Sequence, residues 1–256
     1  MARESDKPIG CGFCGAFPGT ERDAHAYADV TVLAEHRRRG VGTALARAVS
    51  EHAHGLGKTG LTVEAREDTP EAANFLEKRR FVEVERQKAL ALELKGLALA
   101  ESAPPVGVDI VTLAERPELE RGMYEAGIEA GRDIPGLDSE YDPTFEQWRS
   151  FEIERPSRTA ELAFVAVAGY EVVGYAALER YGNVAVHGLT AVRRAWRRRG
   201  IARALKLSEL RAAQAAGFER VLTESVELNE PMRRLNESLG FRAIPGMIVY
   251  QGPLLT

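Results

Sequence analysis

The spacing of apolar residues in the second half of the chain changes from one kind of element to another. Residues 106–113 alternate as a strand does, and residues 117–131 and 144–154 have helical spacing. Three runs between 161 and 192 are rich in valine, alanine and aromatic residues and are separated by short turns containing glycine, tyrosine or asparagine. This pattern is typical of an antiparallel meander.

Helix and strand patterns then take turns to the end of the chain. Residues 201–216 and 230–239 predict helices, each followed by a glycine that ends it, and residues 220–225 and 241–251 predict strands. The whole pattern indicates an α/β (α+β) fold, in which helices flank a mixed, mostly antiparallel central sheet on both faces.

The chain contains an internal repeat with an offset of 160 residues. HRRRGVGTAL at 36–45 matches WRRRGIARAL at 196–205. The same offset lays LTVEA over VLTES and Phe81 over Phe241. A period this long indicates duplicated domains rather than a solenoid.

The two copies are unequal in length. Only 35 residues precede the first match, whereas about 90 separate the second from the Pro-Pro pair at 104–105, which we interpret as a linker. We therefore expect a partial, degenerate domain at 1–100 and a complete domain at 106–256. Either the start lies downstream of the natural one, or another surface covers a sheet edge that the missing elements expose, which favours a homodimer.

Composition narrows the class of protein. The chain has 256 residues, a formal net charge of −4 and a pI near 5.9, which argues against nucleic acid or an anionic membrane as a partner. No apolar run is long enough to span a bilayer and no signal core is present at the start, so we expect a cytoplasmic protein. Cys11 and Cys14 form one C-x-x-C pair without further ligands at metal-binding spacing, so we expect no metal.

An arginine run precedes the helix that begins near Ile201. No Ser, Thr, Asp or Asn between Val192 and Ile201 is placed to cap that helix, so its first N–H groups lack partners. Cations beside the positive end of a helix dipole cost about 0.3–1 kcal/mol each, so we expect an anion nearby. With the small residues Gly200 and Ala202, the loop predicts a phosphate site that a pyrophosphate fits better than a single phosphate.

The loop reads R-x-x-G-x-A at 197–202 and R-x-x-G-x-G at 37–42. The chain has no GK followed by Ser or Thr and no early G-x-G-x-x-G. The loop and the order of elements around it resemble the acetyl-CoA-binding motif of the GNAT superfamily of N-acetyltransferases. ELNEPMRRLNESLGF at 227–241 is similar to a helix of many members. The tandem arrangement is similar to that of mycothiol synthase-like proteins.

This resemblance implies acetyl-CoA as co-substrate, bound by the strand end, the loop, the first helical turn and two asparagines. These residues are Thr190, Ala191, Val192, Arg197, Arg198, Arg199, Gly200, Ile201, Ala202, Arg203, Asn229 and Asn236. In the first copy Arg80 replaces the glycine before Phe81 and no asparagine matches Asn229, so binding there stays open.

The resemblance further implies that a primary amine of a small molecule attacks the thioester directly, in a ternary complex. Backbone N–H groups around Ala191 and Val192 would polarise the carbonyl. For the general base we favour Glu224, which aligns with Glu64 of the first copy. An ion pair with an arginine is an equally good reading of Glu224.

Other residues compete for the two proton transfers. Glu179 and His187 are alternative bases, although a strand histidine is more often a satisfied structural residue. Many relatives use a tyrosine of the last helix as the acid, but the matching residue here is Asn236. A water, or Tyr250 or Tyr181, would have to replace it.

Two rival functions remain. The chain would be a non-catalytic acyl-CoA sensor or scaffold if it kept the loop but lost its acid. It would be an RNA- or DNA-binding module if aromatic residues accompanied the arginines, and only Trp196 does. Acidic residues in the segment 132–143 hint at a cationic acceptor, although a solvated loop explains them equally well.

Overall fold

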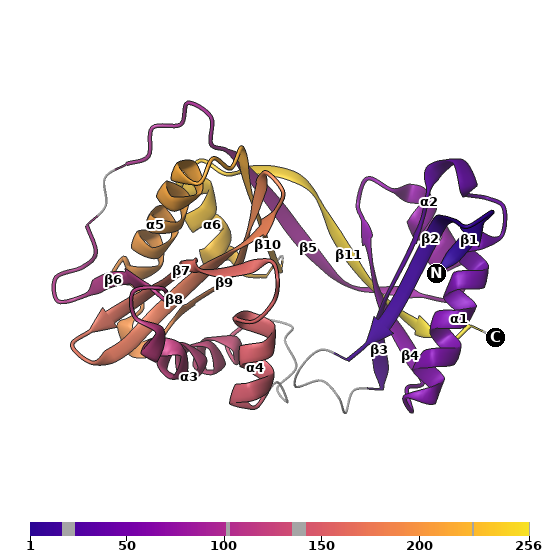
Figure 1. The fold of residues 1–256 in the computed structure, drawn as a ribbon, viewed down its shortest axis with the longest axis horizontal. Coiled ribbons are helices and arrows are strands. Elements are labelled where there is room, and N and C mark those ends of the chain that lie inside the picture. Colours follow the sequence, from indigo (N-terminus) through magenta and orange to yellow (C-terminus); the bar gives the residue numbers. More distant parts are fainter. Residues whose placement is uncertain (17–23, 101–102, 135–141, 227, 256) are drawn as a thin grey trace. The chain divides into compact units, whose positions relative to one another are not determined.

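The computed structural model divides the chain into two compact units (Figure 1). It describes residues 1–16, 24–100, 103–134, 142–226 and 228–255. The first unit consists of Met1–Gln87 with Pro245–Thr256, and the second of Lys88–Ile244. This division differs from the one that the sequence suggested at 100–106, because part of each repeat's last strand lies in the other unit.

The second unit has the mixed sheet that the sequence predicted. Its elements are β6 (Asp109–Thr112), α3 (Glu120–Gly131), α4 (Phe145–Glu152), β7 (Arg158–Ala168), β8 (Glu171–Tyr181), β9 (Val184–Val192), α5 (Ile201–Ala215), β10 (Arg220–Val226) and α6 (Glu230–Ser238). The sheet order is β5-β10-β9-β8-β7-β6, where β5 is Val82–Glu93. Strands β6 to β9 pair antiparallel and β9 pairs parallel with β10, so the predicted meander is confirmed.

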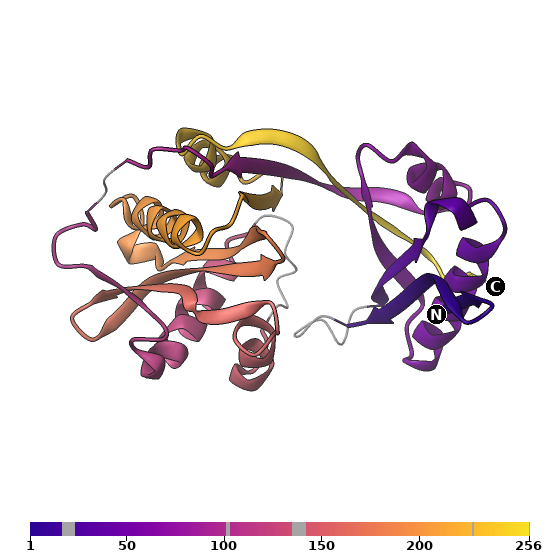
Figure 2. The same cartoon turned by 45° about the horizontal axis from the view of Figure 1, so that its top comes forward.

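Helices cover both faces of this sheet, α3 and α4 on one side and α5 and α6 on the other (Figures 1 and 2). The alternation of strand residues supplies both cores. Val165 and Val167 of β7 pack with the α3 side, and Phe164 and Ala166 pack with the α5 side. The part of β7 from Leu162 to Val167 is therefore apolar because it is buried on both faces.

The first unit is smaller. It contains β1 (Ala2–Glu4), β2 (Lys7–Gly15), β3 (His25–Val32), α1 (Val41–Gly55), β4 (Gly60–Arg66) and α2 (Pro70–Glu77), in the sheet order β1-β2-β3-β4-β11. Within the residues that the structure describes, nothing in this unit corresponds to α3 or α4. The first copy is therefore shorter than the second, as the sequence predicted.

The last strand of the chain, β11 (Arg242–Pro253), completes the sheet of the first unit. Residues Met247–Pro253 pair antiparallel with β4. Tyr250 of this strand is 3% exposed within the first unit's core. The Phe81 ring lies so close to Gly252 that a Cβ there would come within 2.4 Å of it. The first unit therefore depends on residues that belong to the second repeat.

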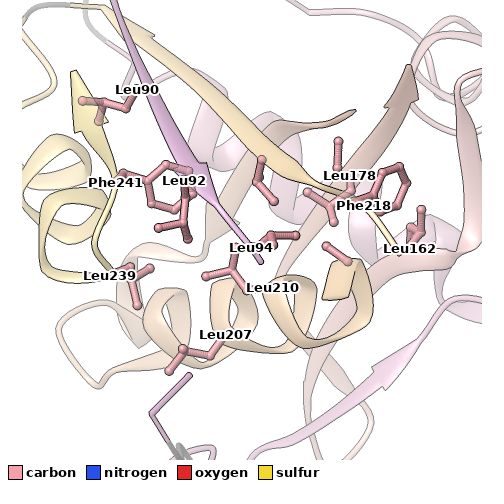
Figure 3. Packing of buried hydrophobic residues seen from close by; sticks show 13 residues of the cluster. Leu90, Leu92, Leu94, Leu162, Leu178, Leu207, Leu210, Phe218, Leu239 and Phe241 are labelled. Carbon is pink, nitrogen blue, oxygen red and sulfur yellow. The ribbon is translucent and has the colours of Figure 1, made fainter. Parts of the chain in front are cut away.

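In return, β5 of the first repeat fills the core of the second unit. Leu90, Leu92 and Leu94 are almost fully buried there (Figure 3). They pack against Leu207, Leu210, Phe218, Leu239 and Phe241. The Leu94 N–H donates to the Glu219 carbonyl at 2.8 Å. Burying each leucine contributes about 1.5–3 kcal/mol, so this exchange stabilises both units substantially.

The exchange predicts that core mutations act across the repeats. We expect Tyr250→Ala to cost about 3–5 kcal/mol and to accelerate amide hydrogen exchange in Gly60–Arg66 of the first unit. The matched variant Leu90→Ala, costing about 2–5 kcal/mol, is expected to act on Arg220–Val226 of the second unit. Mass spectrometry of the two segments is the measurement. If each variant loosened the unit of its own repeat instead, the strand exchange would be wrong.

Candidate functional site

Strands β9 and β10 of the second unit separate after a short paired stretch. Their parallel pairing joins Val184–Val186 with Arg220–Leu222, and among the residues that the structure describes no later register partners are recorded, although β9 continues to Val192 and β10 to Val226. One edge of β9 is therefore left open beyond Val186. An open strand edge offers backbone N–H and C=O groups to a ligand.

The pairing of β9 with β8 shows which backbone groups face that open edge. The Arg193 N–H donates to the Val173 carbonyl at 2.9 Å, and Ala191 pairs with Tyr175 in the same register. Because successive residues of a strand direct their backbone groups to opposite edges, Ala191 faces β8. Thr190 and Val192 face the open edge instead, so of the two residues we expected to polarise a carbonyl, only Val192 is placed for it.

Strand β9 carries a β-bulge just before these residues. Thr190 pairs with Ala176 and His187 with Leu178, so β9 has one more residue than β8 between these two pairs. The extra residue falls at Gly188 or Leu189. Strand β3 of the first unit pairs with β2 without any shift in register. Bulges bend a strand and re-aim its groups, and they are frequent beside active sites.

The loop after β9 leaves the start of α5 uncapped, as the sequence predicted. Gly200 is the N-cap residue with φ 86°, and no side chain caps the helix. A hydrogen bond from the Ala204 N–H to the Gly200 carbonyl, at 3.0 Å, closes the first helical turn. The N–H groups of residues 201–203 thus have no acceptor within the helix. A Cβ at Gly200 would meet nothing within 4 Å, so the space before the helix is open.

Most of the arginines hold the loop itself. Arg197 donates from Nε to the Val192 carbonyl at 2.9 Å, and its Nη1 lies 2.7 Å from Asp133. Arg194, with help from Arg197, lowers the pKa of Asp133 to about 2. Asp133 belongs to the acidic segment that hinted at a cationic acceptor, but its carboxylate forms ion pairs with these two arginines. Residues 135–141 of that segment lie outside the described residues.

The other arginines of the loop differ in their contacts. Arg199 donates to the Ala195 carbonyl and lies over the Trp196 ring, and Arg203 donates to Ser238 Oγ. Arg198 has the left-handed φ of 59°. Among the described residues, no hydrogen bond or ion pair of Arg198 is recorded. Arg198 is therefore the cation of this loop that is left for an anion.

Two of the candidate bases are occupied. Glu179 lies 3.2 Å from Arg158 and accepts hydrogen bonds from Ser157 and Tyr181, both at 2.9 Å. Burial raises the pKa of Glu179, but Arg158 and the two hydroxyls outweigh burial and hold it below its usual value. The Tyr181 hydroxyl, one of the candidate acids, is engaged in its hydrogen bond to Glu179. Glu224 is exposed on β10, two residues beyond the last residue that pairs with β9.

His187 belongs to a buried group of ionisable side chains on the α5 side of β9. Its Nδ1 lies 2.9 Å from Glu209 Oε2, and both side chains are almost completely buried. Burial lowers the pKa of His187 and lowers that of Lys206, on the same helix as Glu209, to about 8. No substrate reaches the His187 ring in this arrangement. Tyr250, the other candidate acid, lies in the core of the first unit.

The two asparagines have different surroundings. Asn229 is the N-cap of α6, where its Oδ1 accepts from the Met232 N–H at 3.4 Å. Asn236 is fully buried, and neither polar atom of its side chain has a hydrogen-bond partner in the described part of the chain. The first unit has Leu76 at the matching position, also buried. A buried amide without partners is costly, so Asn236 is poorly explained by stability alone.

The first unit has the same loop geometry. Gly40 has φ 85° and Arg38 has φ 61°, Arg37 donates to the Val32 carbonyl at 3.0 Å, and α1 has no side-chain cap. The Tyr27 hydroxyl donates to Glu64, the counterpart of Glu224, at 3.2 Å. The two units therefore differ in the strand before the loop rather than in the loop.

Sequence reasoning missed the contacts that surround β9. The pairing of Asp133 with the arginines and the packing of Arg158 against Gly188 join residues that no sequence spacing connects. One signal was present, since a glycine inside a strand pattern, as in NVAVHGLTAV, indicates a bulge or a close backbone approach.

The comparisons with known proteins agree with this geometry. The profile described as the acetyltransferase (GNAT) family matches residues 1–81 and 127–241. A tandem GNAT protein from the clavulanic acid biosynthesis pathway is 22% identical, with a TM-score of 0.72, over 91% of this chain and 76% of that one. No curated protein matches the sequence.

Two further solved structures are similar. A GCN5-related N-acetyltransferase from Sphaerobacter thermophilus is 23% identical with a TM-score of 0.67, over 91% of this chain and 74% of that one. One from Kribbella flavida is 17% identical with a TM-score of 0.62, over 89% and 81%. At these identities the likeness shows the fold. Within the described ranges, no helix is long and apolar enough to cross a membrane, and no group of three or more His, Cys, Asp and Glu could hold a metal ion.

Lys206 predicts a pH dependence of stability. Burial lowers its pKa from 10.5 to about 8 in the folded protein, so between these pH values the unfolded chain binds more protons than the folded one. The free energy of unfolding therefore rises with pH in this window, by about 3 kcal/mol at most. Lys206→Met is expected to remove this rise, so that its free energy of unfolding relative to the wild type falls between about pH 8 and pH 10. Denaturant unfolding measures it, and a difference independent of pH would contradict it.

Proposed function

Because the chain belongs to the acetyltransferase (GNAT) family and so to a family of acyl-transferring enzymes, we propose that its second unit transfers an acetyl group from acetyl-CoA to a primary amine of a small molecule. The observation that carries the proposal is the uncapped first turn of α5 directly after a strand with an open edge. The first feature suits the diphosphate of the coenzyme, and the second suits its acyl end.

The diphosphate fits the start of α5. The N–H groups of residues 201–203 are unused by the helix, and the helix dipole favours negative charge there. Arg198 adds a cation for which no hydrogen bond or ion pair is recorded among the described residues. The open space before Gly200 admits a ligand close to the backbone. Asn229 and Asn236 are proposed to contact the pantetheine arm, which would give the buried Asn236 amide the partners it lacks.

The thioester would lie along the open edge of β9. In the transfer step the amine nitrogen forms a bond to the carbonyl carbon, the carbonyl oxygen gains negative charge, and the bond from carbon to sulfur then breaks. The N–H groups of Thr190 and Val192 face this edge and would stabilise the oxygen in the tetrahedral intermediate. The products are an amide and the coenzyme thiolate.

Two protons must move for the reaction to complete. The acceptor arrives as an ammonium ion and loses a proton before it attacks, and Glu224 is the carboxylate that we assign to this step, directly or through a water. After the attack, the nitrogen of the tetrahedral intermediate loses its second proton to water, and the departing thiolate gains a proton from the same water, since Asn236 cannot supply one and the Tyr181 hydroxyl is engaged with Glu179. A chain that binds coenzyme A but transfers nothing would instead be the acyl-CoA sensor that the missing acid also allows.

The first test of this proposal is Gly200→Glu. A side chain at φ 86° is strained, and a carboxylate there repels the diphosphate, so we expect acetyl-CoA affinity to fall at least about 100-fold, about 2.7 kcal/mol. Calorimetric titration of acetyl-CoA and of CoA measures affinity and stoichiometry. Gly200→Ala controls for the strain alone.

Gly40→Glu is the matched variant of the first unit. It is expected to leave the affinity of the second unit unchanged, and a stoichiometry that falls from two to one would assign a second binding site to the first unit. Unaltered affinity in Gly200→Glu would remove the arginine loop of the second unit from coenzyme binding.

The second test is Glu224→Gln. Removing a general base typically slows turnover about 100-fold or more, so we expect this loss near neutral pH with little change in acetyl-CoA affinity. Turnover should recover at higher pH, where more of the amine is already neutral. Thiol release from acetyl-CoA over a panel of amines is the assay, and Glu161→Gln, an exposed carboxylate on β7, is the control. Full turnover in Glu224→Gln would exclude Glu224 as the base.

A further inference from the structure

Arg158 occupies a buried position where three elements of the second unit meet. It is the first residue of β7, and its side chain is only 5% exposed. Its Nη2 lies 3.1 Å from Glu152 Oε2 at the end of α4 and 3.2 Å from Glu179 Oε1 of β8. Both carboxylates thus contact the same nitrogen of the guanidinium, and the group is held among α4, β7 and β8.

The guanidinium lies directly against Gly188, in the bulge of β9. A Cβ built at Gly188 would come within 2.5 Å of Nη2, 2.7 Å of Nη1 and 3.0 Å of Cζ. Real Cβ atoms do not approach other atoms so closely, so the planar group rests on the glycine backbone. Only a residue without a side chain fits at position 188 beside the Arg158 guanidinium, and this close contact lies within the bulge.

Stability alone does not account for this arrangement. Arg158 Nε and Nη1 are buried and have no hydrogen-bond partner among the residues described. A buried ion pair whose hydrogen-bonding groups are only partly satisfied stabilises the fold less than well-packed apolar side chains of the same volume. The first unit provides the contrast, since β3, which leads into the same loop, pairs with β2 over Tyr27–Val32 without a shift in register.

The preceding residue of β9 is held on the opposite face. His187 points toward α5, where its ring lies 2.9 Å from Glu209, whereas Gly188 faces Arg158. The bulge thus has a buried contact between ionisable side chains on each side of the sheet. Thr190, whose N–H faces the open edge, is only two residues further along the strand.

We propose that Arg158 is a positioning residue, which holds the bulge of β9 through Gly188 and so directs the Thr190 and Val192 N–H groups toward the thioester. This proposal rests on the function proposed above. Arg158 acts only through the backbone of β9 and touches neither the coenzyme nor the amine. Removing the Arg158 guanidinium is therefore expected to lower kcat and to leave the affinity for acetyl-CoA unchanged.

The test compares Gly188→Ala and Arg158→Lys with the wild type. The added methyl group displaces the guanidinium without removing its charge, and lysine keeps the charge without the planar group. For both we expect amide exchange in Val184–Val192 to accelerate about 10-fold, kcat to fall about 10-fold, and the Kd of acetyl-CoA to stay within about threefold. Arg155→Met is the control, because Arg155 lies 3.6 Å from the same Glu179 and is 34% exposed.

The outcomes separate this proposal from the proposed function. Wild-type exchange in Val184–Val192 in both variants would overturn it, and so would exchange accelerated evenly over the whole second unit, which is the mark of lost stability alone. An equal effect of Arg155→Met would overturn it too. If the wild type transfers no acetyl group to any amine, the proposed function fails, while the exchange comparison still decides whether Arg158 holds the bulge.

Discussion

The bare first turn of α5 is the constraint on which the site depends. Helix N–H groups without acceptors are costly unless a side chain, water or ligand satisfies them. Here the chain supplies no capping side chain, places Gly200 in a left-handed conformation and keeps the space in front of it open. The surrounding arginines are mostly bound to Asp133, to carbonyls or to Trp196. They hold the loop in the shape that exposes the N–H groups, and Arg198 is left to meet the anion.

The strand before the loop distinguishes the two units. Their loops agree closely at Arg38 and Arg198 and at Gly40 and Gly200. Among the described register pairs of the two strands, β9 has a bulge before the residues whose N–H groups face the open edge, and β3 has none. We therefore assign acyl transfer to the second unit. The first unit has the same loop shape, and its core includes Tyr250 from the second repeat. Each repeat thus contributes to the stability of the other, which gives a physical reason for keeping both.

The sequence predicted the features whose cause is local. The helices and strands between 106 and 251 follow from apolar periodicity, and the uncapped helix follows from the absence of capping residues before Ile201. The exchange of β5 and β11 could not be predicted, because an alternating strand has the same pattern whichever sheet it joins. Likewise the contact of Arg158 with Gly188 joins residues 30 apart in the chain, and only the glycine within the strand hinted at it.

The most direct test is a crystal structure of the protein grown with coenzyme A. Diphosphate oxygens are expected within about 3 Å of the backbone nitrogens of residues 201–203, with the thiol end beside Thr190 and Val192. A coenzyme whose diphosphate lies elsewhere on the second unit, with that first turn of α5 in contact with water alone, would contradict the account.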